Sequence, residues 1–216
     1  MTEALAIRAA GTFESLPATV PGTVLGAMMA VGFAGCALVG PDPSELSGRQ
    51  VAVAPGLVFS LPGPVDLGRS VEATQLITAR YQQQKFVFET RISITPARLL
   101  LAGTDMLGRR AMTIEWNGGA LKVEAASWVP PELRARNVIA DIMLLHWPAG
   151  AVRGGLPAGA TLREPVPEHR VIAVAGRDVI RADRTAGTPG SWNGRWIYHN
   201  DAWGYDLDIQ SHETAP

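Results

Sequence analysis

The sequence predicts a mainly β protein with helices, in which a curved antiparallel sheet forms an incomplete β-barrel covered by a helical lid. Short segments with strand character follow one another between glycine and proline turns, as in a series of hairpins. One long apolar stretch, residues 133–147, interrupts this series with helical spacing. A strongly curved sheet needs one face covered, and this helix is more apolar than a surface helix requires. We therefore expect the helix to cover the sheet.

The first group of strands precedes the helix. Asn117-Gly118-Gly119 is its strongest local signal, because Asn-Gly favours the positive φ angles of a two-residue hairpin. We therefore expect residues 111–116 to pair antiparallel with 120–125. A polar turn is expected over 82–84. The earlier segments with strand character are 51–53, 57–61, 75–81, 86–94 and 99–102.

The helix and the strands after it complete a predicted domain over 48–216. Pro130-Pro131-Glu132 is expected to open the helix, because proline suits a first turn and glutamate favours the positive end of the helix dipole. Pro148 is expected to end it, and 151–156 to add one further turn. A glycine- and proline-rich loop is expected over 185–194. The later strand segments are 170–175, 178–182, 195–199 and 205–210.

The single cysteine, Cys36, follows an apolar run over 24–33 and the small residues Ala34-Gly35. This is the layout of a secretory signal, with a short apolar region before a small-residue cleavage site. The segment resembles a bacterial lipobox, which implies that 1–35 is a signal peptide and that the Cys36 thiol receives a diacylglycerol. Residues 36–47 then form a tether. The alternative is a buried cysteine in a short apolar helix.

The residue after the cysteine bears on localisation. Ala37 resembles the sorting signal of bacterial lipoproteins that are exported to the outer membrane. We therefore expect a protein that is anchored in the outer membrane by its N-terminal lipid and faces the periplasm.

The composition excludes several classes of protein. Lysine and arginine total 19 against 20 acidic residues, a net charge of −1, so no nucleic-acid partner is expected. Hydrophobic residues make up 47% and charged residues 18%, which is too apolar for a disordered chain. No stretch after the N-terminal one is long enough to span a bilayer alone.

No catalytic or metal-binding motif is found, so we expect no enzyme, no catalytic residues, no metal and no cofactor. His199-Asn200-Asp201 falls in a predicted hairpin turn, where asparagine and aspartate suit the backbone. Asp141 is the only acid inside the predicted helix, and we expect it on the polar face or paired with Arg134 or Arg136. No two histidines are three or four residues apart; they are His146, His169, His199 and His212.

Several of these features resemble the LolA/LolB superfamily. They are the lipobox, the strand over 99–103 followed by Met106-Leu107-Gly108-Arg109-Arg110, and the Asn117-Gly118-Gly119 hairpin. The sequence is more closely similar to a group of uncharacterised LolB-like lipoproteins, which are often encoded beside aryl polyene biosynthesis genes. The shared segments are the helix end over 144–148, the turn over 156–159 and the final strand over 203–209.

The resemblance implies a LolB-like half-barrel with an apolar cavity for acyl chains. The implied ligand is a lipid, a lipoprotein or a polyene lipid, and the implied partner is a periplasmic LolA-like carrier. LolB inserts its cargo with an exposed apolar residue on a protruding loop. Met106-Leu107 is the candidate for such a tip, with plugging of the core as the alternative. We expect a monomer.

Ten apolar residues are the candidates for contact with the ligand, and ordinary core packing is the alternative for each of them. They are Leu99, Leu101, Met106, Leu107, Trp116, Ile139, Ile142, Met143, Leu145 and Trp147. The leading hypothesis is an outer-membrane lipoprotein that helps to transfer or insert a lipid. The alternative is a non-transporting lipoprotein that docks on an export or envelope-assembly complex.

Overall fold

The computed structural model describes residues 48–129 and 134–214. The predicted signal peptide, Cys36, the tether and the predicted helix opening at Pro130-Pro131-Glu132 lie outside these residues. The described chain is dominated by one ten-stranded antiparallel sheet. Its strands are β3 (Val71–Tyr81), β4 (Gln84–Thr95), β5 (Arg98–Asp105), β6 (Arg110–Trp116), β7 (Leu121–Ala125), β8 (Ala160–Arg163), β9 (His169–Val174), β10 (Arg177–Gly187), β11 (Gly194–Asn200) and β12 (Tyr205–Thr214).

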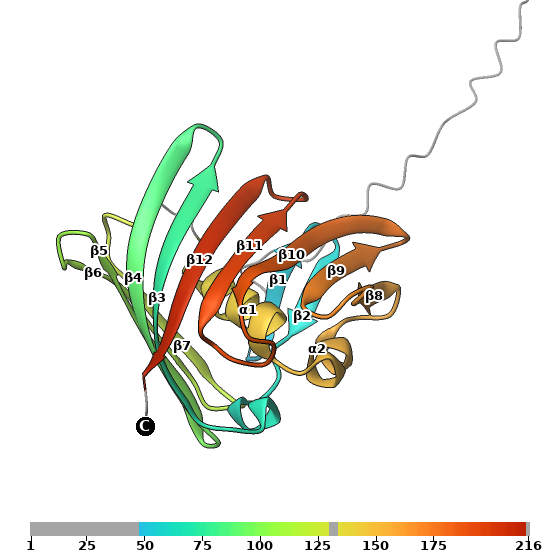
Figure 1. The fold of residues 1–216 in the computed structure, drawn as a ribbon, viewed down its shortest axis with the longest axis horizontal. Coiled ribbons are helices and arrows are strands. Elements are labelled where there is room, and N and C mark those ends of the chain that lie inside the picture. Colours follow the sequence, from blue (N-terminus) through green and yellow to red (C-terminus); the bar gives the residue numbers. More distant parts are fainter. Residues whose placement is uncertain (1–47, 130–133, 215–216) are drawn as a thin grey trace, which may run out of the picture. The chain divides into compact units, whose positions relative to one another are not determined.

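The sheet joins two meanders through strands from opposite ends of the described chain. The spatial order is β7-β6-β5-β4-β3-β12-β11-β10-β9-β8, so β12 pairs with β3. Their ladder runs from Tyr205 opposite Tyr81 to Thr214 opposite Glu72. The sheet curves strongly but its edge strands β7 and β8 do not pair, so it is not closed into a barrel (Figure 1).

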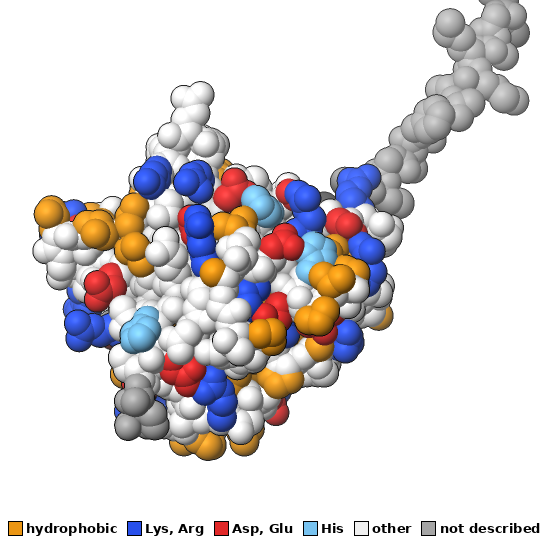
Figure 2. Space-filling view, viewed as in Figure 1, with side chains coloured by type: hydrophobic (Ala, Val, Ile, Leu, Met, Phe, Trp, Pro, Cys, Tyr) orange, Lys and Arg blue, Asp and Glu red, His pale blue; other side chains and the backbone are white. Residues whose placement is uncertain are grey.

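The strands form because apolar and polar side chains alternate. In β3 every second residue from Val71 to Ala79 is buried on the concave face. The convex face carries ion pairs such as Arg195–Asp208 at 2.7 Å and Arg181–Asp201 at 3.0 Å. Figure 2 shows basic and acidic side chains intermixed over this side of the sheet. The alternation thus directs the core to the concave face.

Helix α1 (Ala135–His146) lies inside the curve of the sheet, with the hairpin of β1 (Gln50–Ala54) and β2 (Leu57–Ser60) on its other side (Figure 1). Every residue from Ile139 to Leu145 is at most 5% exposed. The width of the predicted apolar stripe follows from this position, because both sides of the helix are covered.

Two shorter elements close the end of the core near β2. A 3-10 helix, η1 (Pro64–Leu67), precedes β3, and α2 (Ala149–Gly155) follows α1. Trp116 Nε1 and Trp147 Nε1 donate hydrogen bonds to the carbonyls of Pro62 and Gly63, at 2.8 and 3.0 Å. A Cβ atom at Gly155 would lie 2.4 Å from the Ser60 carbonyl oxygen, so only glycine permits this contact between α2 and β2.

The main predictions for the fold are confirmed at the level of secondary structure. The chain is mostly β with a helix between two groups of strands, and β6 pairs with β7 from Met112 opposite Ala125 to Trp116 opposite Leu121. The expected two-residue turn is wrong, because the four residues 117–120 separate Trp116 from its partner Leu121, and Gly118 rather than Asn117 has a positive φ, of +88°. Asn117 instead accepts hydrogen bonds at Oδ1 from the backbone N–H groups of Gly119 and Ala120.

Three expectations about strands and turns need correction. The loop predicted over 185–194 is shorter, because β10 continues to Gly187 and pairs there with Gly194 after a bulge at Arg184/Ala186. The four-residue edge strand β8 was not predicted. His199 and Asn200 belong to β11, and Asp201 alone of that triplet lies in the turn.

Within the described ranges, no helix has the length and apolar character needed to cross a bilayer.

Candidate functional site

A cavity of about 170 Å³ lies between the concave face of the sheet and the N-terminal half of α1. Its wall is mostly apolar and comes from β3, β4, β5, β6, β12 and α1. The apolar side chains that line it are Ile77, Ala79, Phe88, Met112, Val138, Ile142, Leu207 and Ile209. The sheet therefore presents a hydrocarbon surface to whatever occupies this space.

Gly103 keeps the floor of the cavity open. The strand register sets Thr90 of β4 opposite Gly103 of β5, and Gly103 opposite Met112 of β6. A Cβ atom at Gly103 would lie 3.2 Å from Met112 Cγ and 3.7 Å from Thr90 Cγ2. A larger side chain at this position would enter the cavity, which explains a glycine in the interior of a strand.

Thr90 adds an unpartnered polar atom to this floor. Its side chain lines the cavity and is only 3% exposed, and its Oγ1 forms no hydrogen bond with the described residues. A buried hydroxyl without a partner costs free energy, so water or a bound molecule is the natural partner for it.

Asp141 forms the polar part of the cavity wall. Its carboxylate accepts hydrogen bonds from the hydroxyl of Tyr198 at 2.6 Å and from that of Tyr205 at 2.9 Å. Burial raises the pKa of Asp141 to about 7, although the two tyrosine hydrogen bonds act to lower it. The expectation of a polar face or a pair with Arg134 or Arg136 is wrong, because Asp141 faces the sheet and is 5% exposed.

Burial and further hydrogen bonds hold Tyr198 and Tyr205 in place. Burial raises the pKa of Tyr198 and of Tyr205 well above the ordinary value, and the Asp141 charge adds to this effect in both. Asn200 Nδ2 donates to the carbonyl of Val53 at 2.8 Å and to the Tyr205 hydroxyl at 3.3 Å. This network links α1 to β11, β12 and the β1–β2 hairpin.

The rim of the cavity lies at the start of α1. The Arg134 guanidinium stacks 4.2 Å above the Trp203 ring, and both residues line the cavity. Asn137 Nδ2 donates to the Ala52 carbonyl at 2.7 Å, which ties the first turn of the helix to β1. The rim thus has a cation stacked on an indole beside the apolar interior.

A second hollow, of about 410 Å³, lies at the other end of α1 and differs in chemistry. The His146 ring stacks on Trp192 with 3.9 Å between ring centroids, and its edge meets Trp196. Arg184 lies over the Trp196 ring at 5.2 Å from its centroid. These groups come from the end of α1, from β10 and β11, and from the loop between these two strands.

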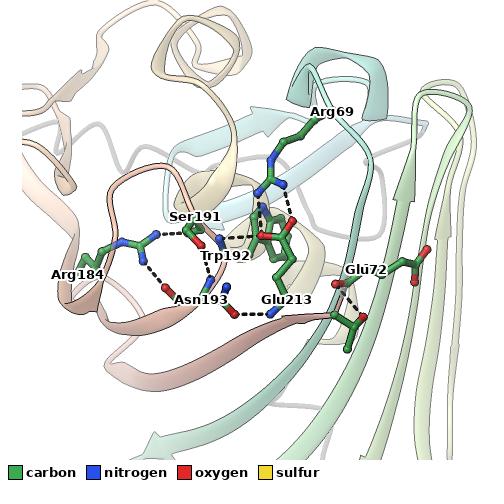
Figure 3. Close-up of polar contacts among 8 residues, drawn as sticks. Arg69, Glu72, Arg184, Ser191, Trp192, Asn193 and Glu213 are labelled. Carbon is green, nitrogen blue, oxygen red and sulfur yellow. Dashed lines mark hydrogen bonds and ion pairs between the residues drawn. The ribbon is translucent and has the colours of Figure 1, made fainter. Parts of the chain in front are cut away.

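The cations around the second hollow have partners among the described residues. Arg69 pairs with Glu213, and Arg184 donates to the carbonyls of Ser191 and Asn193 (Figure 3). Glu168 pairs with Arg184 at 2.8 Å, and Glu164 pairs with Arg170 at 2.9 Å. The charges around the second hollow therefore pair within the protein, whereas Trp196 Nε1 and Gln75 Oε1 are buried without a hydrogen-bond partner among the described residues.

His146 is held neutral beside these paired charges. It is partly exposed, and its Nε2 lies 3.3 Å from Gln75 Nε2. Desolvation lowers the pKa of His146 well below the ordinary value, and the nearby charge of Arg184, Arg170 and Arg69 lowers it further. Uncharged imidazole can accept a hydrogen bond from the Gln75 amide, which agrees with this geometry.

The ten predicted ligand contacts are divided among four places. Ile142 lines the apolar cavity, Leu145 and Trp147 line the second hollow, and Met106 and Leu107 are 66% and 81% exposed at the β5–β6 turn. The alternative that Met106-Leu107 plugs the core is therefore wrong. The other five are fully buried in the closed core and do not line the cavity: Leu99, Leu101, Trp116, Ile139 and Met143.

The sequence reasoning missed the residues that give the cavity its character, which are Gly103, Thr90, Asp141, Tyr205 and the Arg134–Trp203 stack. The strand predicted over 99–102 extends to Asp105 in the structure, so a glycine interior to β5 could have been noticed only with that longer strand. The other residues meet only through strand pairing, so no local pattern identifies them. Among the described residues no cluster of His, Cys, Asp and Glu is placed to hold a metal ion.

Fold and cavity together define a β-rich protein with an open antiparallel sheet, an internal helix and a small apolar cavity between them. The chain belongs to the family described as "Protein of unknown function (DUF3261)", whose match covers residues 72–213. This range includes nearly all of the ten-stranded sheet, α1 and both hollows. No match to a curated protein was found.

Proposed function

We propose that this chain is a lipid-handling lipoprotein that binds an acyl chain between the concave face of its sheet and α1. The observation that supports this proposal most directly is the apolar cavity of about 170 Å³, which Gly103 keeps open. The open, curved sheet with an internal helix also supports the resemblance to LolA and LolB. By that resemblance, the protein helps to transfer or insert a lipid, lipoprotein or polyene lipid into the outer membrane.

The size of the cavity limits what it holds in this conformation. An engineered apolar cavity of about 150 Å³ stays dry and binds benzene, so a cavity of about 170 Å³ takes a few methylene groups of one chain. Each methylene removed from water contributes about 0.8 kcal/mol. A longer acyl chain requires the start of α1 to move away from the sheet.

Two further features belong to the proposed membrane role. Met106 and Leu107 form an exposed apolar turn between β5 and β6, and Asp105 Oδ1 accepts hydrogen bonds from the backbone of Leu107 and Arg109 to fix its shape. Figure 2 shows hydrophobic side chains at the end of the molecule where Figure 1 places this turn. A rigid apolar tip can enter a bilayer surface, while lipidated Cys36 holds the protein at the membrane.

The alternative function, a docking protein without a cargo, is favoured by one observation. Five of the ten predicted contact residues are packed in the closed core, so much of the concave face is occupied by the protein itself. The two functions differ in whether the remaining cavity takes a ligand.

The experiment measures binding of the neutral apolar fluorophore N-phenyl-1-naphthylamine to the purified full chain. Gly103→Leu fills the cavity, and Ala102→Leu, whose side chain is exposed on the same strand, is the matched control. We expect Gly103→Leu to weaken binding by at least tenfold and Ala102→Leu to change it by less than twofold. Ala79→Leu, from the β3 side of the cavity, repeats the test should Gly103→Leu not fold. Equal binding by the wild type and folded cavity-filling variants would overturn the proposal in favour of the docking protein.

A further inference from the structure

We infer that the cavity is specific for a single-chain amphiphile with an anionic carboxylate or phosphate head, which binds at the start of α1 against Arg134. The apolar end of the ligand then points toward Gly103 and Met112. This inference rests on the proposed function, and it adds the chemistry and orientation of the ligand.

Arg134 is placed to receive an anionic group. Its guanidinium carbon lies over the Trp203 ring, 4.2 Å from the centroid, at the rim of the cavity. A guanidinium placed over an indole retains N–H donors for the bidentate hydrogen bonds that carboxylates and phosphates form. Arg134 forms no ion pair with any residue in the described part of the chain.

The start of α1 adds to the positive potential at the same place. The helix has no side-chain hydrogen bond from its N-cap, and its first turn contains no acidic residue. Arg134 and Arg136 both lie here, at the end of the helix where the dipole disfavours cations. An anion bound at this end relieves that unfavourable arrangement.

Asp141, the acid in the cavity wall, repels an anionic ligand only weakly. The Asp141 carboxylate is already bound by the hydroxyls of Tyr198 and Tyr205, and burial raises its pKa to about 7. Near neutral pH a substantial fraction of Asp141 is therefore uncharged. Arg80 also contributes to the lining, but it belongs to the exposed face of β3.

The orientation follows from the distribution of polar groups along the cavity. The floor is formed by Gly103 and Met112, and its one polar side chain is Thr90, a neutral hydroxyl. A charged head placed there would lose its hydration without gaining a counter-ion, which is strongly unfavourable. At the rim the same head meets Arg134 and remains near solvent, so the apolar end is the part that enters.

The test measures the affinity of the full chain for dodecanoate, dodecyl phosphate and dodecanol, three probes with one chain and different heads. We expect wild-type protein to bind both anionic probes at least tenfold more tightly than dodecanol. Arg134→Gln should abolish this preference and change dodecanol binding by less than twofold. Arg91→Gln, on the exposed face of β4 with a side chain 81% exposed, is the charge-matched control and should retain the preference. The two anions compared with each other identify the head group.

A second variant tests the orientation. Thr90→Val removes the hydroxyl at the floor while keeping the shape of the side chain, and we expect it to leave all three affinities within twofold. A selective loss of anion binding in Thr90→Val would overturn the proposed orientation. Equal affinity of the wild type for dodecanol and the anions would overturn the role of Arg134, and so would a preference that survives in Arg134→Gln. Either result would leave the proposed function standing. Failure of every probe to bind, dodecanol included, would overturn the proposed function and this inference with it.

Discussion

The two halves of helix α1 differ in how each buries an ionisable side chain against the sheet. These side chains are Asp141, in the middle of the helix beside the cavity, and His146, the last residue of the helix, and each favours its uncharged form. Around His146, stacked indoles and paired arginines line the second hollow. Around Asp141 two tyrosines satisfy the carboxyl group and an apolar cavity remains beside it.

The hydrogen bonds at the two ends of α1 indicate which end is held more firmly. At the C-terminal end, Arg170 donates to the Leu144 carbonyl at 2.7 Å and Trp147 donates to the Gly63 carbonyl at 3.0 Å. At the N-terminal end Asn137 donates to the Ala52 carbonyl at 2.7 Å, but the N-cap residue, Arg134, has a positive φ of 38° and makes no side-chain cap bond. We therefore expect the C-terminal end to carry stability and the N-terminal end to admit a ligand.

Trp147→Ala is expected to have the largest effect on stability. Trp147 is fully buried at the fixed end of α1, and truncation of a buried tryptophan costs about 3–5 kcal/mol through lost burial and a new cavity. Urea denaturation measures the loss. Trp128→Ala is the control, because Trp128 is 38% exposed, and it should cost less than about 1 kcal/mol. Similar losses in the two variants would contradict the assignment of the fixed end.

Asp141→Asn tests the ligand end through the pH dependence of folding. The pKa of Asp141 rises from 3.8 unfolded to about 7 folded, so the folded state retains a proton that the unfolded state releases. The stability contributed by protonated Asp141 is complete below pH 4 and is lost as the pH rises to 7. Relative to Asp141→Asn, wild-type protein should lose on the order of 2–4 kcal/mol between these limits. A difference that stays constant in urea denaturation from pH 4 to pH 8 would contradict this account.

His146→Gln is expected to show the opposite sign. The folded pKa of His146 lies below the ordinary value of 6.5, so the unfolded state binds a proton that the folded state excludes. Its contribution is complete above pH 6.5 and is lost as the pH falls below that value. Wild-type stability relative to His146→Gln should therefore decrease on acidification. The same denaturation series measures this change, and an increase on acidification would show that the hollow accepts charged imidazole.

The smallest effect on stability is expected at the β5–β6 turn, which touches neither end of α1. Replacing Met106 and Leu107 by serine should change the free energy of unfolding by less than about 0.5 kcal/mol, because both side chains are exposed. Fluorophore binding in the cavity should also be unchanged. Vesicle flotation of the lipidated chain should fall if the turn enters the bilayer. Weaker binding in the cavity would mean that this turn and the cavity are coupled.

Local sequence patterns identified the helix and most strands, since alternation and helical spacing are local properties. They did not identify β8, which is a four-residue edge strand, or the end of β10, where a bulge and Gly187 interrupt the pattern. The β3–β12 ladder and the bonds from Asp141 to Tyr198 and Tyr205, 57 and 64 residues away, depend on long-range pairing.

The candidate site likewise combines features that are local in the sequence with features that depend on long-range strand pairing. Alternation correctly directs Leu99, Leu101 and Trp116 inward, but it does not reveal which part of the concave face the β1–β2 hairpin and α1 fill. The cavity arises because Gly103 lies between Thr90 and Met112, and that neighbourhood is set by strand register. Of the ten residues that the sequence suggested as ligand contacts, only Ile142 lines the cavity on which the proposed function depends.

Native mass spectrometry of the full chain expressed in bacteria tests the central claim most directly. We expect wild-type protein to carry a discrete additional mass that organic extraction removes, and Gly103→Leu to lack it. An identical bound mass in folded Gly103→Leu would place the ligand elsewhere. A wild-type protein that stays free of ligand after incubation with dodecanoate and phospholipid vesicles would contradict the claim that this cavity holds an acyl chain.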